Sequence, residues 1–85
     1  MKADTLQAET EHRIAELRAA HPRISVCHAT FDEWHEDAGP CHALRLDIRW
    51  PQHQSLVSGP ARASIRAAVD AAFEMAARTL ERTHA

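Results

Sequence analysis

The chain has 85 residues, 45% of them apolar, and a net charge of −2 with its histidines neutral. This length allows one domain with a small core, and the apolar fraction is that of a globular protein. The negative balance excludes the strongly basic class of nucleic-acid binders. No run approaches the roughly 18 apolar residues that a membrane span needs, so we expect no membrane partner.

The first helix is expected over residues 4–20. Its apolar positions recur at helical spacing and form one narrow stripe of Leu6, Thr10, Ile14 and Leu17. The helix should stop at His21-Pro22, because the residue before a proline avoids the helical region of backbone space.

Three strands are expected next, over residues 23–34, 41–50 and, as a short edge strand, 52–58. In the first strand, alternation places Ile24, Val26 and Trp34 on the face that packs against the helices. Cys27 and Phe31 then face away from the helices. The middle strand alternates most strictly, and Trp50 is expected, like Trp34, to complete the core.

A second helix is expected from Gly59-Pro60 to about Arg82, because proline suits the first turn of a helix. Its stripe consists of Ile65, Val69, Ala72, Phe73, Ala76 and Leu80. The order α-β-β-β-α predicts an α+β fold in one domain spanning 1–85. Its expected architecture is a three-stranded antiparallel sheet with two helices packed on one face.

Charge is divided unevenly along the chain. Residues 1–41 contain eight acids and four bases, a balance of −4, whereas residues 42–85 contain six arginines and four acids, a balance of +2. Compared with lysine, arginine binds phosphate oxygens better, because its guanidinium can donate two hydrogen bonds to them at once. The only plausible RNA-facing set is therefore Arg45, Arg49, Arg62, Arg66, Arg78 and Arg82. The alternative is that these arginines only keep the surface hydrated and pair with neighbouring acids such as Asp70, Glu74 and Glu81.

Several segments together resemble the ribosome hibernation promoting factor family, also called ribosome-associated inhibitor or sigma-54 modulation proteins. They are 13–17 (RIAEL), 23–25 (RIS), 44–51 (LRLDIRWP), 56–57 (LV), 68–74 (AVDAAFE) and 78–80 (RTL). The chain resembles a shortened member of that family. The family's first strand is missing, a lysine usual in its last helix is Met75 here, and the first helix is acidic.

The resemblance implies a β-α-β-β-β-α fold and binding in the small-subunit channel that holds messenger and transfer RNA. It implies that Arg78 is the basic position of the last helix and that Arg45 and Arg49 are the outward charged positions of the strand. Loss of the first strand leaves the 24–34 strand as a bare edge. We expect two chains to pair there in a symmetric homodimer, with an edge comprising Val26, Cys27, Ala29 and Phe31.

No catalytic, cofactor or metal site is expected. Cys27 and Cys41 each precede a histidine, but no Cys-x-x-Cys pair is present, and adjacent strand residues point to opposite faces. Nothing in the spacing selects a nucleophile and its base, and two glycines do not make a phosphate-cradling loop. The N-terminus shows no secretion signal, so a cytoplasmic protein with reduced thiols is expected.

Three functions follow in order of preference. The first is a ribosome-associated regulator that binds the small subunit or its RNA and modulates translation. The second is a protein-interaction or dimerisation module that keeps the fold without RNA binding. The third is a double-stranded-RNA-binding domain, which has the same α-β-β-β-α order but needs a more basic start to its last helix. An enzyme is not expected.

Overall fold

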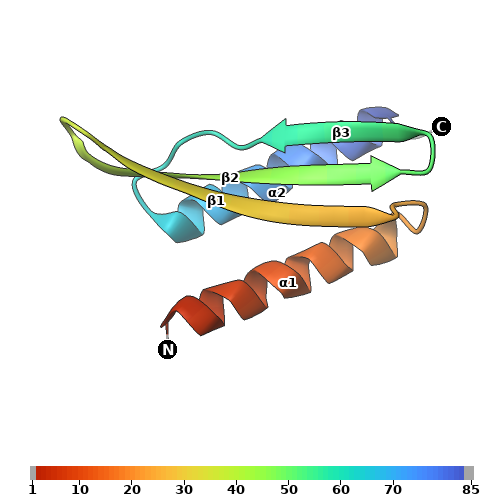
Figure 1. Ribbon diagram of the computed structural model, residues 1–85, viewed down its shortest axis with the longest axis horizontal. Helices are drawn as coiled ribbons and strands as arrows, with labels where there is room; N and C mark the ends of the chain where they lie inside the picture. Colours follow the sequence, from red (N-terminus) through yellow and green to blue (C-terminus); the bar gives the residue numbers. More distant parts are fainter. Residues whose placement is uncertain (1, 84–85) are drawn as a thin grey trace.

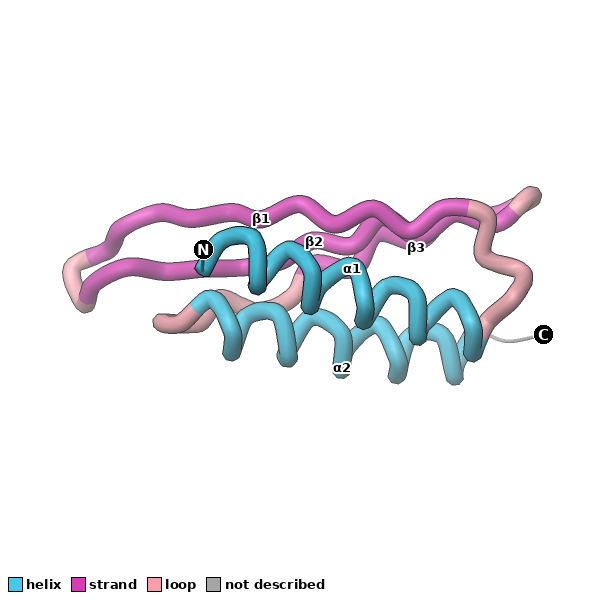
Figure 2. The backbone as a smooth tube through the Cα atoms, turned by 90° about the horizontal axis from the view of Figure 1, so that it is seen from below, coloured by secondary structure: helices cyan, strands magenta, loops and turns pink. Residues whose placement is uncertain are grey.

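A computed structural model describes residues 2–83, with side chains for residues 6–82. Its elements are α1 (Lys2–Ala20), β1 (Val26–Glu36), β2 (Gly39–Trp50), β3 (His53–Ser58) and α2 (Ile65–Thr83). The strands form one antiparallel sheet in the order β1-β2-β3, and both helices pack on the same face of it (Figures 1 and 2). The predicted α+β class and α-β-β-β-α order are confirmed.

The β1–β2 hairpin is longer than predicted, because His35 and Glu36 continue β1 and Gly39 and Pro40 begin β2. The ladder runs from Val26 opposite Arg49 to Glu36 opposite Gly39. Gly39 has a φ of 126°, a conformation that side-chain-bearing residues rarely adopt, so this glycine allows the tight turn. The far end of the hairpin extends past the first turns of both helices (Figure 2).

The core lies between the sheet and α2. Leu44, Leu46 and Ile48 alternate along β2 and are fully buried. They meet Val57 of β3 and the stripe of α2 formed by Val69, Ala72, Phe73, Ala76 and Leu80. This stripe was predicted, except that Ile65, in its first turn, remains exposed. Much of the α2 stripe is alanine, whose small side chain lets the helix approach the sheet closely.

The predicted start of the last helix was wrong. Residues 59–62 are extended and run along β2, where Arg62 and His42 exchange two backbone hydrogen bonds of 2.7 and 2.8 Å. The helix begins only at Ile65, after Ser64, whose Oγ accepts a hydrogen bond from the Ala67 N–H. A serine in this position caps the helix, and the backbone bonds to β2 outweigh the preference of Pro60 for a first turn.

The predicted faces of β1 were also wrong. Cys27 and Ala29 face the helices and pack against the core, whereas Trp34 lies on the opposite face, 37% exposed, and donates its Nε1–H to Glu36. Side chains alternate regularly from Val26 on, but the buried Ile24 precedes the ladder. Ser25 and Val26 both lie against Arg49, so the phase shifts by one residue between Ile24 and the strand. Trp50 does pack against the core, as predicted.

The helix α1 is held less deeply than α2. Its residues Leu6, Ile14 and Leu17 are only half-buried against the core. Thr10 is buried, and its hydroxyl donates a hydrogen bond to the Leu6 carbonyl oxygen. Figure 1 shows α1 beside β1, reaching beyond the edge of the sheet, and running in the same direction as α2. Both helices therefore end at the same end of the molecule.

Candidate nucleic-acid interface

The six arginines predicted to face RNA are all exposed, but they occupy three separate places. Arg45 and Arg49 lie on the face of the sheet away from the helices. Arg62 and Arg66 lie at and before the start of α2. Arg78 and Arg82 lie in its last turns. The structure therefore does not gather these side chains into one surface.

On the open face of the sheet, both arginines pair with carboxylates of the same face. The Arg45 Nε donates to Asp32 across the strand pair, at 2.8 Å. Arg49 donates to Asp47 at 3.0 Å, and Gln54 donates to the second oxygen of Asp47 at 2.8 Å. The hydrogen bonds from Arg49 and then Gln54 hold the pKa of the Asp47 carboxyl below its usual value.

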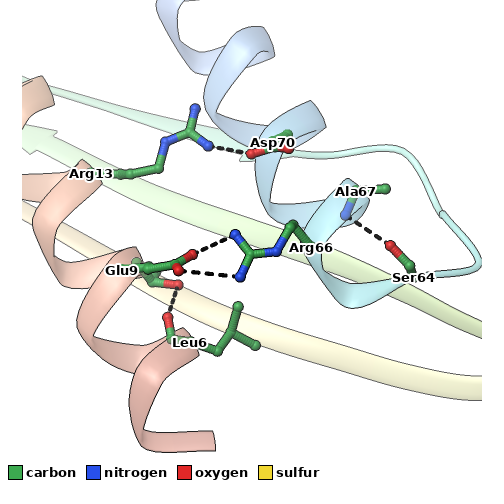
Figure 3. A network of polar contacts seen from close by, with 8 residues as sticks. Leu6, Glu9, Arg13, Ser64, Arg66, Ala67 and Asp70 are labelled. Atoms are coloured by element: carbon green, nitrogen blue, oxygen red, sulfur yellow. Dashed lines mark hydrogen bonds and ion pairs between the residues drawn. The ribbon is translucent and has the colours of Figure 1, made fainter. Parts of the chain in front are cut away.

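Between the N-terminal halves of the helices lies a groove of about 530 Å³ with Leu6 and Val69 in its lining. Two ion pairs cross it, as Figure 3 shows. Arg66 makes a two-point contact with Glu9, at 2.7 and 3.2 Å. Arg13 pairs with Asp70 and also lies 4.8 Å over the Phe73 ring. These pairs tie α1 to α2 where apolar burial is thin.

The Glu9–Arg66 ion pair across the groove should make part of the free energy of unfolding depend on pH in the acid range. The hydrogen bond from Arg66 lowers the pKa of Glu9. A carboxyl whose folded pKa is depressed stabilises the fold above its unfolded pKa, and this contribution is lost as pH falls through the folded pKa. The melting temperature of Glu9→Gln, measured by circular dichroism, should therefore lie slightly below that of the wild type at pH 7, and the difference should shrink as the pH falls toward the folded pKa of Glu9. A difference that grows as the pH is lowered would contradict this.

Arg78 and Arg62, which lie outside the groove, have weaker side-chain partners. Arg78 lies 3.5 Å from Glu74, and among the described contacts the Arg62 guanidinium donates to the Ala61 carbonyl oxygen. Four of the six candidate arginines thus pair with carboxylates of the same chain, and Asp70 pairs with Arg13 and not with one of the six. The expectation that neighbouring acids would pair with these arginines is confirmed in part.

Two groups escaped the sequence reasoning. The ion pairs across the groove join residues 57 positions apart in the sequence, so no local sequence pattern predicts them. Arg18 and Arg23 were missed as candidates. Arg18 lies in the last turn of α1 and Arg23 in the connection from α1 to β1, which the structure brings to the same end as the last turn of α2 (Figure 1). The visible signal was an arginine on each side of the His21-Pro22 helix stop.

No metal-ligand cluster is assembled in the described part of the chain. There, no three of the histidine, cysteine, aspartate and glutamate side chains come together as ligands. Cys27 lies opposite Ile48 and Cys41 lies opposite Trp34, so the two thiols are far apart in the ladder. Burial raises the pKa of the Cys27 thiol, which keeps it protonated and unreactive.

The predicted dimer edge exists as an edge. Strand β1 pairs with β2 on one side only, among the strands that the structure describes. Val26 and Phe31 of this edge are exposed, Phe31 by 41%, while Cys27 and Ala29 turn toward the core. Within the described residues, neither helix is both long and apolar enough to cross a membrane.

Comparison of the chain with models of protein families, with curated proteins and with solved structures finds no match in any of the three.

Proposed function

We propose that this chain is a ribosome-associated regulator that binds RNA of the small subunit and modulates translation. The observation that supports it is that all nine arginines but the half-buried Arg13 are exposed, including all six candidates. Exposed ion pairs contribute only about 0–1 kcal/mol. A phosphate can therefore replace Asp32, Asp47 or Glu74 as the partner of an arginine at little cost, and the internal pairs do not exclude RNA.

Recognition of duplex RNA by the helix layer is less well supported. The α-β-β-β-α order fits that class, but α1 presents Glu11 and Glu16 to solvent and the hairpin tip carries Glu36 and Asp37. Acidic side chains on the surface that would have to follow phosphates oppose such binding. Irregular or single-stranded RNA, contacted by scattered arginines, suits the charge distribution better.

Co-sedimentation with purified small ribosomal subunits tests the proposal. The wild type should pellet with subunits at low salt, and the variant with Arg62, Arg66, Arg78 and Arg82 all replaced by glutamate should stay in the supernatant. Circular dichroism of the variant is needed to show that it folds, because Arg66 also ties α1 to α2 through Glu9. Equal pelleting of the two proteins would refute the role of these arginines.

The second candidate is a homodimerisation module that pairs through β1, and the bare edge of an eleven-residue strand favours it. Antiparallel pairing centred on Thr30 would set Val26 of one copy opposite Trp34 of the other, and His28 opposite Asp32. Both pairs are complementary. Because α1 reaches beyond this edge (Figure 1), it would have to swing aside in such a dimer.

Light scattering at tens of micromolar decides this candidate. A dimer mass that falls to the monomer mass when Phe31 is replaced by proline supports it. In the alternation of the ladder the Phe31 N–H points away from β2, so proline removes a backbone donor near the centre of the pairing. Pro at position 54 of the opposite edge strand (Gln54→Pro) is the matched control and should leave the mass of a β1-paired dimer unchanged. A monomer mass for the wild type would exclude the module.

A further inference from the structure

The two ends of the molecule carry opposite charge. One end, here called the arginine end, is formed by the close of α1, the α1–β1 connection, the β2–β3 turn and the last turns of α2, which lie together in both views (Figures 1 and 2). Counted over the last two turns of each helix (14–20 and 77–83), the α1–β1 connection and residues 47–53 around the β2–β3 turn, it carries Arg18, Arg23, Arg49, Arg78 and Arg82, against Glu16, Asp47 and Glu81. The formal balance is +5 − 3 = +2.

The other end is the projecting β1–β2 hairpin. Residues 24–44 contain no lysine or arginine, and the hairpin holds Asp32, Glu33, Glu36 and Asp37, a formal −4. Of these acids, Asp32 accepts a hydrogen bond from Arg45, which comes just after residues 24–44. Glu36 accepts one from the uncharged Trp34. The charge that makes the whole chain negative is thus concentrated at the end away from the arginine end.

The separation between the ends decides how they act. The molecule is 42 Å long, whereas exposed charges are screened over about 8 Å at physiological ionic strength. Neither end therefore cancels the other, and a polyanion near the arginine end meets a local cationic surface despite the net charge of −2. The carbonyl ends of both helices point there and reduce this positive charge by about half a unit each, which leaves it positive.

The arginine end also offers an aromatic surface. The rings of Trp50 and His53, on either side of the β2–β3 turn, lie 4.8 Å apart at 45°. Trp50 is anchored against the core, and His53 is exposed. Aromatic side chains beside a cationic surface are the combination on which bases of single-stranded nucleic acid stack.

We propose that the chain binds a single-stranded stretch of RNA end-on. Phosphates meet the arginine end, a base lies against His53 and Trp50, and the acidic hairpin points away from the RNA. This rests on the proposed RNA-binding function and narrows it. It adds Arg18 and Arg23 to the interface and removes Arg45, Arg62 and Arg66 from it.

Two double variants with equal changes in net charge test the location. Arg23→Glu with Arg82→Glu reverses the arginine end, and Arg45→Glu with Arg62→Glu reverses two arginines elsewhere. The probe is a mixed-sequence single-stranded oligoribonucleotide of about a dozen nucleotides, near the upper site size of small single-strand binders. The first pair should weaken its binding about tenfold or more, equivalent to about 1.4 kcal/mol, and the second pair by less than about twofold.

The two tryptophans supply an independent readout, because Trp50 lies at the arginine end and Trp34 in the hairpin. In a Trp34→Phe protein the remaining Trp50 fluorescence should change on addition of the oligoribonucleotide. In a Trp50→Phe protein the remaining Trp34 fluorescence should not. This measurement leaves every arginine in place, so it decides the location even if a charge-reversal variant fails to fold.

The outcomes separate the two proposals. If the wild type binds but the two double variants lose affinity equally, or the Trp34 signal responds in place of Trp50, the end-on interface is wrong and the RNA-binding function stands. If the wild type does not bind the oligoribonucleotide or small subunits at low salt, the proposed function itself fails.

Discussion

Replacing Leu46 by alanine is expected to lower the free energy of unfolding by about 2–5 kcal/mol. Leu46 lies at the centre of the middle strand, fully buried between Ala29 of β1, Val57 of β3 and the α2 stripe. Its neighbours belong to three different elements and cannot all close around the cavity. In a domain of this size, with a thin stability margin, this loss removes much of the folded population at 37 °C.

Urea denaturation followed by circular dichroism measures this effect. The matched control is Leu56→Ala, because Leu56 is on the neighbouring strand but faces solvent, 62% exposed. The control should change the free energy of unfolding by less than about 0.5 kcal/mol. Equal destabilisation by the two variants would contradict the assignment of the sheet's inner and outer faces.

Replacing Gly59 by alanine is expected to destabilise the protein by about 1–3 kcal/mol through overpacking. A Cβ at this position would lie 2.7 Å from the Ala72 Cβ, 2.9 Å from the Ala72 Cα and 3.1 Å from the Leu44 carbonyl oxygen. Gly59 also donates its N–H to that oxygen at 2.9 Å, so the chain cannot simply move away. The glycine lets the chain leave β3 directly beneath α2.

A double-mutant cycle identifies this contact as the cause. Ala72→Gly alone should destabilise by roughly 1 kcal/mol, because glycine is a poor helix former. The double variant Gly59→Ala with Ala72→Gly should lose less free energy of unfolding than the sum of the two single losses, since the Ala72 methyl group that would clash with the new Cβ is absent. Strict additivity in thermal or urea denaturation would show that the Gly59 effect has another origin.

The order of elements could be predicted from the sequence because each depends on local chemistry. The alternation of residues 44–50 identifies β2, and the spacing of Val69, Phe73 and Leu80 identifies α2. The face of β1 could not be read in the same way. Which side chains of a strand face the core is set from its first paired residue. Ile24 is apolar and shares the even-numbered positions with Val26 and Trp34, which favoured that face as the inner one, but Ile24 lies outside the ladder.

The start of α2 shows a second limit. Gly59-Pro60 reads locally as a helix start, but the backbone groups of Gly59 and Arg62 bond to β2. Pairing with residues fifteen and twenty positions earlier, Leu44 and His42, is a tertiary effect, and no residue near Pro60 encodes it. Ser64 carried the better local signal, since a serine before an apolar-periodic run is a preferred cap.

The candidate arginines were identified one by one, but their grouping depends on the fold. Arg78 and Arg82 were predicted to act with Arg62 and Arg66 as members of one RNA-facing set. The helix instead separates them by its own length and brings Arg82 to the end that holds Arg18 and Arg23 (Figure 1). Composition gave a net charge of −2, and only the arrangement of elements separates that charge into two ends.

The most direct test of the central claim is the salt dependence with which the Trp34→Phe protein, all of whose arginines are in place, binds an unstructured oligoribonucleotide, measured by Trp50 fluorescence. Contact with two to four phosphates predicts that the logarithm of the binding constant falls with the logarithm of salt concentration. The expected slope is roughly −1.5 to −3. A binding constant that does not change between about 50 and 200 mM salt, or no binding at the lower concentration, would contradict RNA recognition by the arginine end.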